Sequence, residues 1–321
     1  MLNVDRDARA HAYAAQYQGA LADHLPMSLS ALQRMGAGGE RRRAFEQTYV
    51  SAKRLRTLEE SDPEFQARRI IHDRIVAQGR KAVLQEELSM LARGIGAGAF
   101  HALIRVAYGI IDDRDDEISA GLTYWRDVAL DLGTATGPMD AMPFHASSAI
   151  ERVRATLAHV PNELGSRGLI AARMAIVARA AAFDPAVGHP RFGDAAVAQF
   201  AALTVRAFAA TRSFTLLHAM TATHALRIVL PYARDREQIL QCFWRAAAAA
   251  YVSAAAPALL PQDDLAAEAE RAPAWPELLA LACAADDEHI IKATFTAWTE
   301  DATYHDPFYR LAAARYMNLG A

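Results

Sequence analysis

Hydrophobic positions along the chain recur at spacings of three and four residues, which is the period of an α-helix. Leu84, Leu88 and Leu91 would line one helix face, and Phe200 and Leu203 would lie on another. The alternation of β-branched residues that strands favour is almost absent, and alanine dominates. Abundant alanine also lets helices approach closely. The pattern therefore predicts an all-α protein with essentially no sheet.

Helix-breaking residues divide this pattern into segments of ordinary helix length. The breaks leave roughly ten to twelve predicted helices. They fall at Gly36–Gly39, Asp62–Pro63, Gly133–Pro143, Pro161–Gly168, Asp184–Pro190, Pro231, Pro257–Pro261 and Pro273–Pro276.

We expect residues 1–321 to form a single compact domain. The loosest stretch, 133–149, has the composition of a linker, but candidate site residues lie on both sides of it. A long surface loop within one domain is the simpler interpretation. No repeat of 20 to 50 residues is evident, which argues against a solenoid.

Composition narrows the class of protein. The 321 residues are 53% hydrophobic and 22% charged, with a net charge of −3, so nothing favours binding to nucleic acid or an anionic membrane. The alanine-rich stretch 245–261 is interrupted by Pro257 and predicts a buried helix, not a membrane span. The N-terminus has no apolar core of a secretory signal, and Cys242 and Cys283 match no disulfide or metal pattern. We therefore expect a cytoplasmic protein.

Five residues carry the candidate chemistry, and each lies in a segment predicted to be helical. One buried imidazole needs only a hydrogen-bond partner, but several that converge indicate a bound metal. The candidate ligands are His24, His101, His218, His289 and Lys292.

Lys292 is an unusual companion for a metal-binding histidine. It lies three residues after His289, which places both on one helix face, and Asp286 comes one turn earlier. Because an ammonium repels a cation, the lysine must be deprotonated, point away, or be carbamylated by CO₂. A surface acid–base pair is the simpler alternative. His224 lies six residues after His218, so the two face different sides of one helix, and we expect His218 to point inward.

An acidic motif offers a second hypothesis. Asp112, Asp113 and Asp116 form the D-D-x-x-D pattern with which all-α isoprenoid synthases bind Mg²⁺ against a diphosphate. A second acidic cluster would be needed late in the chain, and the nearest candidate, 262–270, lacks the hydroxyl residue and the correctly spaced glutamate. A solvated helix start, where acidic side chains suit the helix dipole, is the alternative.

The run before His101 also loosely matches a dinucleotide-binding fingerprint, with Gly94, Gly96 and Ala99 in the G-x-G-x-x-A positions. That fingerprint requires a preceding strand, whereas the preceding residues predict a helix. The small residues are better explained by close approach of another helix or a ligand.

Four segments of the chain resemble the questin oxidase-like family, whose members are all-helical and open aromatic polyketide rings oxidatively. They are 23–37, 96–110, 214–232 and 287–297, and they span nearly the whole chain. The resemblance implies a non-haem Fe(II) site whose ligands are His24, His101, His218, His289 and a carbamylated Lys292.

The function that this resemblance implies is an oxygenase that uses O₂ for ring opening or Baeyer–Villiger-type insertion on an aromatic polyketide-like substrate. Arg105, one turn after His101, would orient a phenolate or oxyanion, unless it forms a salt bridge with the aspartates at 112–116. Phe100, Tyr108, Phe214 and Trp298 are candidate pocket walls. The resemblance implies NADPH as a reductant, although the sequence shows no dinucleotide site. A homodimer is compatible with the sequence. A non-catalytic helical binding protein remains the competing class.

Overall fold

Helices account for almost all regular structure in the computed structural model, which describes residues 12–135, 137–160, 168–259 and 262–319. Within these ranges there are sixteen α-helices and two short 3-10 helices, η2 and η3, so the all-α prediction is confirmed. The elements in chain order are β1 (Gln16–Tyr17), β2 (Leu21–Ala22), α1 (Leu25–Arg34), α2 (Gly39–Lys53), α3 (Pro63–Gln78), α4 (Arg80–Leu91), η2 (Ala92–Gly94), α5 (His101–Ile111), α6 (Asp115–Asp127), α7 (Ala146–Leu157), α9 (Ile170–Ala178), α10 (Phe183–Val187), α11 (Ala196–Thr211), α12 (Phe214–Val229), η3 (Leu230–Tyr232), α13 (Arg236–Ser253), α14 (Gln262–Arg271), α15 (Trp275–Ala284), α16 (Glu288–Tyr304) and α17 (Phe308–Tyr316).

The helices outnumber the predicted ten to twelve because several breaks depend on a single residue. Gly79 separates α3 from α4 at a φ of +86°, Asp113 separates α5 from α6 at +57°, and Arg212 separates α11 from α12 at +54°. One residue in the left-handed region ends a helix without interrupting the hydrophobic period. A prediction from hydrophobic periodicity therefore counts two successive helices as one when a single residue separates them.

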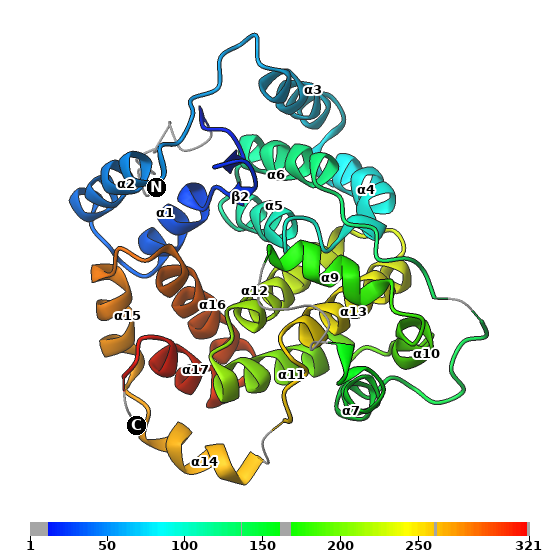
Figure 1. The fold of residues 1–321 in the computed structure, drawn as a ribbon. Coiled ribbons are helices and arrows are strands. Elements are labelled where there is room, and N and C mark those ends of the chain that lie inside the picture. The colour runs from blue at the N-terminus through cyan, green and yellow to red at the C-terminus, as the bar shows by residue number, and fades with distance from the viewer. Residues whose placement is uncertain (1–11, 136, 161–167, 260–261, 320–321) are drawn as a thin grey trace.

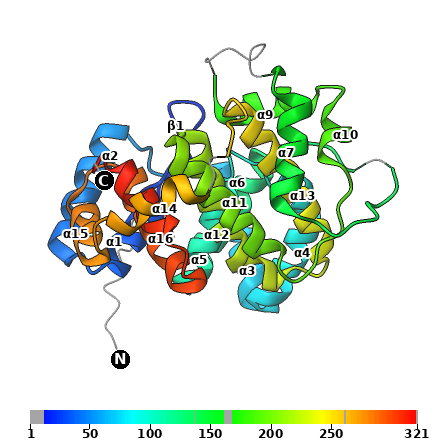
Figure 2. The same cartoon turned by 90° about the horizontal axis from the view of Figure 1, so that it is seen from below.

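The helices that matter for the site lie near the middle of the molecule. Figures 1 and 2 show α12 near the centre in both views. It packs against α5, α11, α13 and α16, while α5 packs against α6 and α1 packs against α16. Four helices from distant parts of the sequence are thereby brought to one place.

Small residues permit the close pairing of α5 with α6. A Cβ atom placed on Gly109 would lie 2.7 Å from the backbone nitrogen of Ile118. A Cβ on Gly121 would lie 2.8 Å from the backbone nitrogen of Val106. Any larger side chain at either glycine would force these two helices apart.

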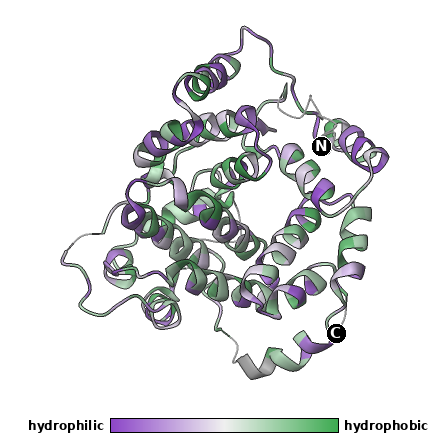
Figure 3. Ribbon diagram, turned by 180° about the vertical axis from the view of Figure 1, so that it is seen from behind, coloured by the Kyte–Doolittle hydropathy of each residue, from purple (hydrophilic) through white to green (hydrophobic). Residues whose placement is uncertain are grey.

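Buried apolar side chains form one continuous cluster that runs from Ala15 to Ala314. The leucine face at 84–91 belongs to it, and so does α13, in which Ala246–Val252 are all buried. Figure 3 shows the apolar ribbons gathered toward the centre and the polar ones mostly in the outer helices. No helix in the described residues is long and apolar enough to cross a membrane. The single-domain organisation stays a prediction.

The only sheet among the described residues is the two-stranded hairpin β1–β2, with Gln16 opposite Ala22. Its turn contains Gln18 and Gly19, both with positive φ. The second strand ends at Ala22, two residues before His24. This hairpin therefore delivers the chain to the first candidate ligand.

Candidate metal centre

Four imidazoles from four different helices meet in the interior. His24 is the residue before α1, His101 begins α5, His218 lies on α12 and His289 lies at the start of α16. One ring nitrogen from each lies within 4.8 Å of the others. The first three side chains are buried, and that of His289 is 13% exposed. The predicted convergence of these four histidines is present in the structure.

The rings are arranged edge to face around a common point. The Nε2 atoms of His24 and His101 are 2.7 Å apart. Ring centroids are separated by 4.6 Å between His24 and His101, 4.7 Å between His101 and His218, and 4.8 Å between His24 and His289. These separations bring the four rings together and suit four ligands of one ion.

Backbone carbonyls fix the tautomers of two of the rings. His101 donates a hydrogen bond from Nδ1 to the carbonyl of Gly98, and His218 donates one from Nδ1 to the carbonyl of Phe214 over 2.7 Å. A carbonyl only accepts, so Nδ1 carries the proton and Nε2 of each neutral ring keeps its lone pair. This is the arrangement that orients a histidine for metal binding.

The other two rings leave buried nitrogen atoms free. Nε2 of His289 and Nδ1 of His24 have no hydrogen-bond partner among the described residues. Nδ1 of His289 lies 3.6 Å from Oδ1 of Asp287, the residue that caps α16. A buried nitrogen without a partner is costly, and a cation bound by Nε2 of His289 would remove that cost at this ring.

Burial keeps the cluster uncharged. Desolvation lowers the pKa of His218 to about 3 and that of His289 below its usual value, and holds the pKa of His24 and His101 well below theirs. Repulsion from neighbouring cations adds to the effect of burial on each ring. Neutral imidazoles are the form that binds a transition metal.

Lys292 lies beside the four rings and is itself buried. Its ammonium is one of the charges that lower the pKa of every imidazole in the cluster. Burial lowers the pKa of Lys292 to about 7, against the opposing effect of nearby carboxylates. A large fraction of this amine is therefore neutral near pH 7, as both metal binding and reaction with CO₂ require.

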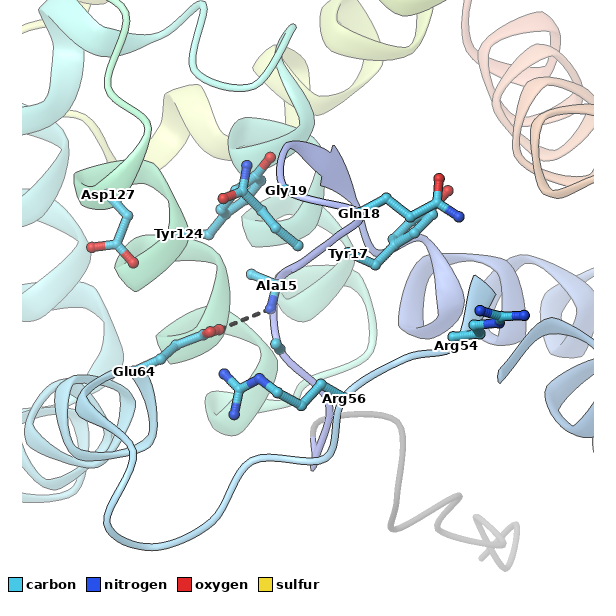
Figure 4. A pocket seen from close by; sticks show the side chains of 11 residues that line it. Ala15, Tyr17, Gln18, Gly19, Arg54, Arg56, Glu64, Tyr124 and Asp127 are labelled. Carbon is cyan, nitrogen blue, oxygen red and sulfur yellow. Dashed lines mark hydrogen bonds between the residues drawn. The ribbon is translucent and has the colours of Figure 1, made fainter. Parts of the chain in front are cut away.

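The loop before α5 sets the position of His101. Gly98 has a φ of +54°, and a Cβ atom placed on it would lie 2.5 Å from the hydroxyl of Tyr124. Tyr124 also lines a hollow of about 420 Å³ beside the β1–β2 hairpin, together with Tyr17 and Arg54 (Figure 4). None of the four imidazoles lines this hollow. Tyr124 thus separates the hollow from the loop that holds His101.

Arg105 is buried with a partner that the sequence did not suggest. Its Nε atom donates to Oε2 of Glu117 over 2.9 Å, whereas both Nη atoms have no partner within the described part of the chain. Arg105 therefore forms a salt bridge, as the alternative predicted, but with Glu117 and not with the aspartates at 112–116. After the effect of burial, Arg105 is the largest influence on the pKa of Asp23, which burial raises to about 6. A role of Arg105 on a substrate stays a prediction.

The aspartates at 112–116 are engaged by arginines and form no metal-binding group in the described residues. Asp112 pairs with Arg34, and Asp113 pairs with Arg80. Asp116 pairs with Arg114, and Asp113 is 87% exposed. The acids belong to the surface of the α5–α6 corner, as the alternative of a solvated helix start predicted. The side chains of 262–264, in the second acidic stretch, lie outside the described residues.

His224 faces away from the cluster, as its spacing from His218 predicted. Its Nδ1 atom lies 2.6 Å from Oε1 of Glu300, which also pairs with Arg227.

The sequence did not identify Asp287, which accepts backbone hydrogen bonds at the start of α16. An aspartate directly before a helical pattern is a recognisable capping signal. The carbonyls of Gly98 and Phe214 gave no such signal, because every residue has one.

The Gly94–Ala99 run lies in a 3-10 turn and loop after α4, not between a strand and a helix. A dinucleotide fingerprint is therefore excluded at this position.

Comparison with known proteins supports the resemblance found in the sequence. A model of the family described as Questin oxidase-like matches residues 140–296. The matched range contains His218, His289 and Lys292, while His24 and His101 precede it. No curated protein gives a significant match.

Proposed function

A model of the Questin oxidase-like family matches residues 140–296, and from that match we propose that the protein is a non-haem iron-dependent oxygenase. Its reaction would be oxidative ring opening, or Baeyer–Villiger-type insertion of oxygen beside a carbonyl, on an aromatic polyketide-like substrate. The observation that carries the proposal is the group of four buried imidazoles whose ligand atoms lie within 4.8 Å of one another.

The donor set fits Fe(II). Neutral imidazole nitrogens suit iron. In His101 and His218 the Nδ1 proton is used in a hydrogen bond to a carbonyl, so Nε2 carries a lone pair that can bind a metal. Iron bound there would supply the redox chemistry that activates O₂. The protein's own part is to hold the imidazoles neutral, exclude water and orient the substrate.

Lys292 would complete the site as a carbamate. Its neutral amine attacks the carbon of CO₂, a new N–C bond forms, and the amine proton leaves to solvent. The product is an anionic carboxylate-like oxygen on a long arm, which replaces a repelling ammonium by an attracting ligand. The lowered pKa of Lys292, about 7, makes the reactive form abundant.

The supporting test is O₂ consumption by the iron-loaded protein. The protein is loaded anaerobically with Fe²⁺ and mixed with O₂ and a panel of hydroxyanthraquinones, with and without NADPH. Substrate-dependent O₂ uptake and a ring-opened or oxygen-inserted product by mass spectrometry are expected. Uptake that occurs without substrate, or none with any aromatic compound, contradicts the proposal.

Lys292→Ala separates the oxygenase from a helical binding protein that lacks chemistry. If Lys292 is a carbamylated ligand, the variant loses iron or activity, keeps its circular dichroism spectrum, and is partly rescued by added formate or acetate. Lys81→Ala is the control, because Lys81 is exposed and lies on α4, a helix that carries none of the four imidazoles. Unchanged iron content and activity in Lys292→Ala would remove the lysine from the site.

A further inference from the structure

Phe214 is placed unusually for a phenylalanine in this protein. Its side chain is 48% exposed, although it is the first residue of α12 and next to the buried cluster. Its ring lies edge to face against His218, at 4.6 Å between centroids, and against His289, at 4.7 Å. The ring therefore covers the two imidazoles on one side and is open to solvent on the other.

Helix α9 borders the same place. Arg173 on α9 donates from Nη2 to the hydroxyl of Thr215, the residue after Phe214, over 3.0 Å. A Cβ atom on Gly96 would lie 3.2 Å from the methyl group of Met174, so α9 also packs on the loop that leads to His101. This helix spans from the His101 loop to the start of α12.

Two exposed apolar side chains flank Arg173 in the sequence. Leu169, the residue before α9, is 45% exposed, and Ile176, one turn after Arg173 on α9, is 50% exposed. Single exposed apolar residues are ordinary. Here two of them flank Arg173, and Arg173 contacts Thr215, the residue next to the exposed Phe214.

Arg173 has unused capacity to bind an anion. Its one hydrogen-bond partner in the described chain is a neutral hydroxyl, and its Nε atom is buried without a partner. No carboxylate of the described residues pairs with it. A planar guanidinium of this kind binds a phenolate or carboxylate with charge-assisted hydrogen bonds.

We propose that Phe214 and Arg173 form the substrate-recognition face of the site. A planar aromatic ring packs on the exposed face of Phe214, whose other side covers His218 and His289, and its phenolate or carboxylate oxygen binds Arg173. Leu169 and Ile176 cover the distal edge of the ring. The inference rests on the proposed function and specifies how its substrate is recognised.

The test measures binding apart from turnover. A hydroxyanthraquinone is titrated anaerobically into iron-loaded protein, followed by its visible absorbance, and compared with the O-methyl ether of the same ring system. Wild-type protein should prefer the hydroxy compound. Arg173→Gln should weaken its binding by roughly 10-fold to 100-fold and abolish the preference, since the charge-assisted bond is lost. Phe214→Ala should weaken the binding of both compounds, whereas Phe214→Tyr, which keeps an aromatic ring, should bind both as wild type does.

Controls separate recognition from folding and from metal binding. Leu281→Ala removes a similarly exposed apolar side chain on α15 and should bind both compounds as wild type does. Iron content should be unchanged in the Arg173 variant. If wild type binds and oxidises the ring while both variants bind it equally well, the recognition face is wrong and the proposed function stands. If wild-type protein binds no aromatic compound, both fail together.

Discussion

Gly98 is the residue on which the orientation of His101 depends. Its carbonyl accepts the Nδ1 proton of His101, and Tyr124 packs against its α-carbon. A hydrogen bond of this kind holds a ligand ring in place, and its loss usually reduces metal affinity by ~10-fold to 100-fold.

Gly98→Ala should therefore weaken metal binding by about that factor, because the new methyl group and the Tyr124 hydroxyl cannot both be accommodated. The dissociation constant for Fe²⁺ or Co²⁺ measures it. Gly36→Ala is the matched control: Gly36 also has a positive φ, +95°, but no atom lies within 4 Å of the position that its new methyl group would occupy. If both variants bind metal as wild type does, the Gly98 carbonyl does not position His101.

Much of the site at the residue scale could be predicted from the sequence. An imidazole in an apolar helical segment stands out, so the four histidines that converge were identifiable. Lys292 as a ligand stays a prediction. Backbone partners were not identifiable, because carbonyls carry no sequence signal. Glu117 was also missed, because it is the last acid of a polar run whose composition is typical of a protein surface. The turn at Asp113 brings it back toward Arg105.

At the scale of elements, the Arg105–Glu117 pair joins α5 to α6. Both side chains are almost fully buried, and the helices are in backbone contact at Gly109 and Gly121. Removing one partner of a buried ion pair leaves an uncompensated charge, which costs more than the pair itself contributes. The pair therefore makes the relative position of these helices sensitive to either residue.

Arg105→Leu should destabilise the fold by about 3–5 kcal/mol, measured as the free energy of unfolding in urea, because Glu117 stays buried without its partner. Replacing Glu117 by leucine as well should recover much of the loss. Arg93→Leu is the control, since its pair with Asp131 is 55% and 52% exposed and should contribute less than about 1 kcal/mol. Equal effects of Arg105→Leu and Arg93→Leu would mean that the buried pair has no special role.

Helix boundaries were predictable where a proline or capping acid marks them, as at α1 and α3, which have a proline in their first turn. They were not where an ordinary residue turns the chain. Arg212 illustrates this: nothing in the sequence requires a left-handed arginine, yet the break it makes between α11 and α12 exposes Phe214 and begins the helix of His218.

At the scale of the whole molecule, the buried neutral histidines couple stability to pH. The unfolded chain binds a proton on each near the ordinary value of 6.5, whereas folded His218 does so only near 3. The stability that depends on these neutral rings is thus fully present above pH 6.5 and is lost as pH falls through that value toward the folded pKa. The raised pKa of Asp23 opposes this between 3.8 and about 6, but it is one group against four.

Metal-free protein should therefore unfold at a lower urea concentration at pH 5 than at pH 7. Each buried imidazole adds a slope of ~1.4 kcal/mol per pH unit well below pH 6.5. His218→Gln should flatten the dependence, whereas His159→Gln, at an exposed position, should not. Identical midpoints at pH 5 and pH 7 in wild-type protein would show that the four rings are not held neutral by the fold.

The central claim is that the imidazoles of His24, His101, His218 and His289 bind one transition metal ion. The direct measurement is elemental analysis of untagged protein prepared without chelators and loaded anaerobically with Fe²⁺, in wild type and in His101→Ala, His218→Ala and His159→Ala. Close to one iron ion per chain is expected in wild type and in His159→Ala, and almost none in the other two. A wild-type protein that binds no metal, or variants at His101 and His218 that retain it, would contradict the account.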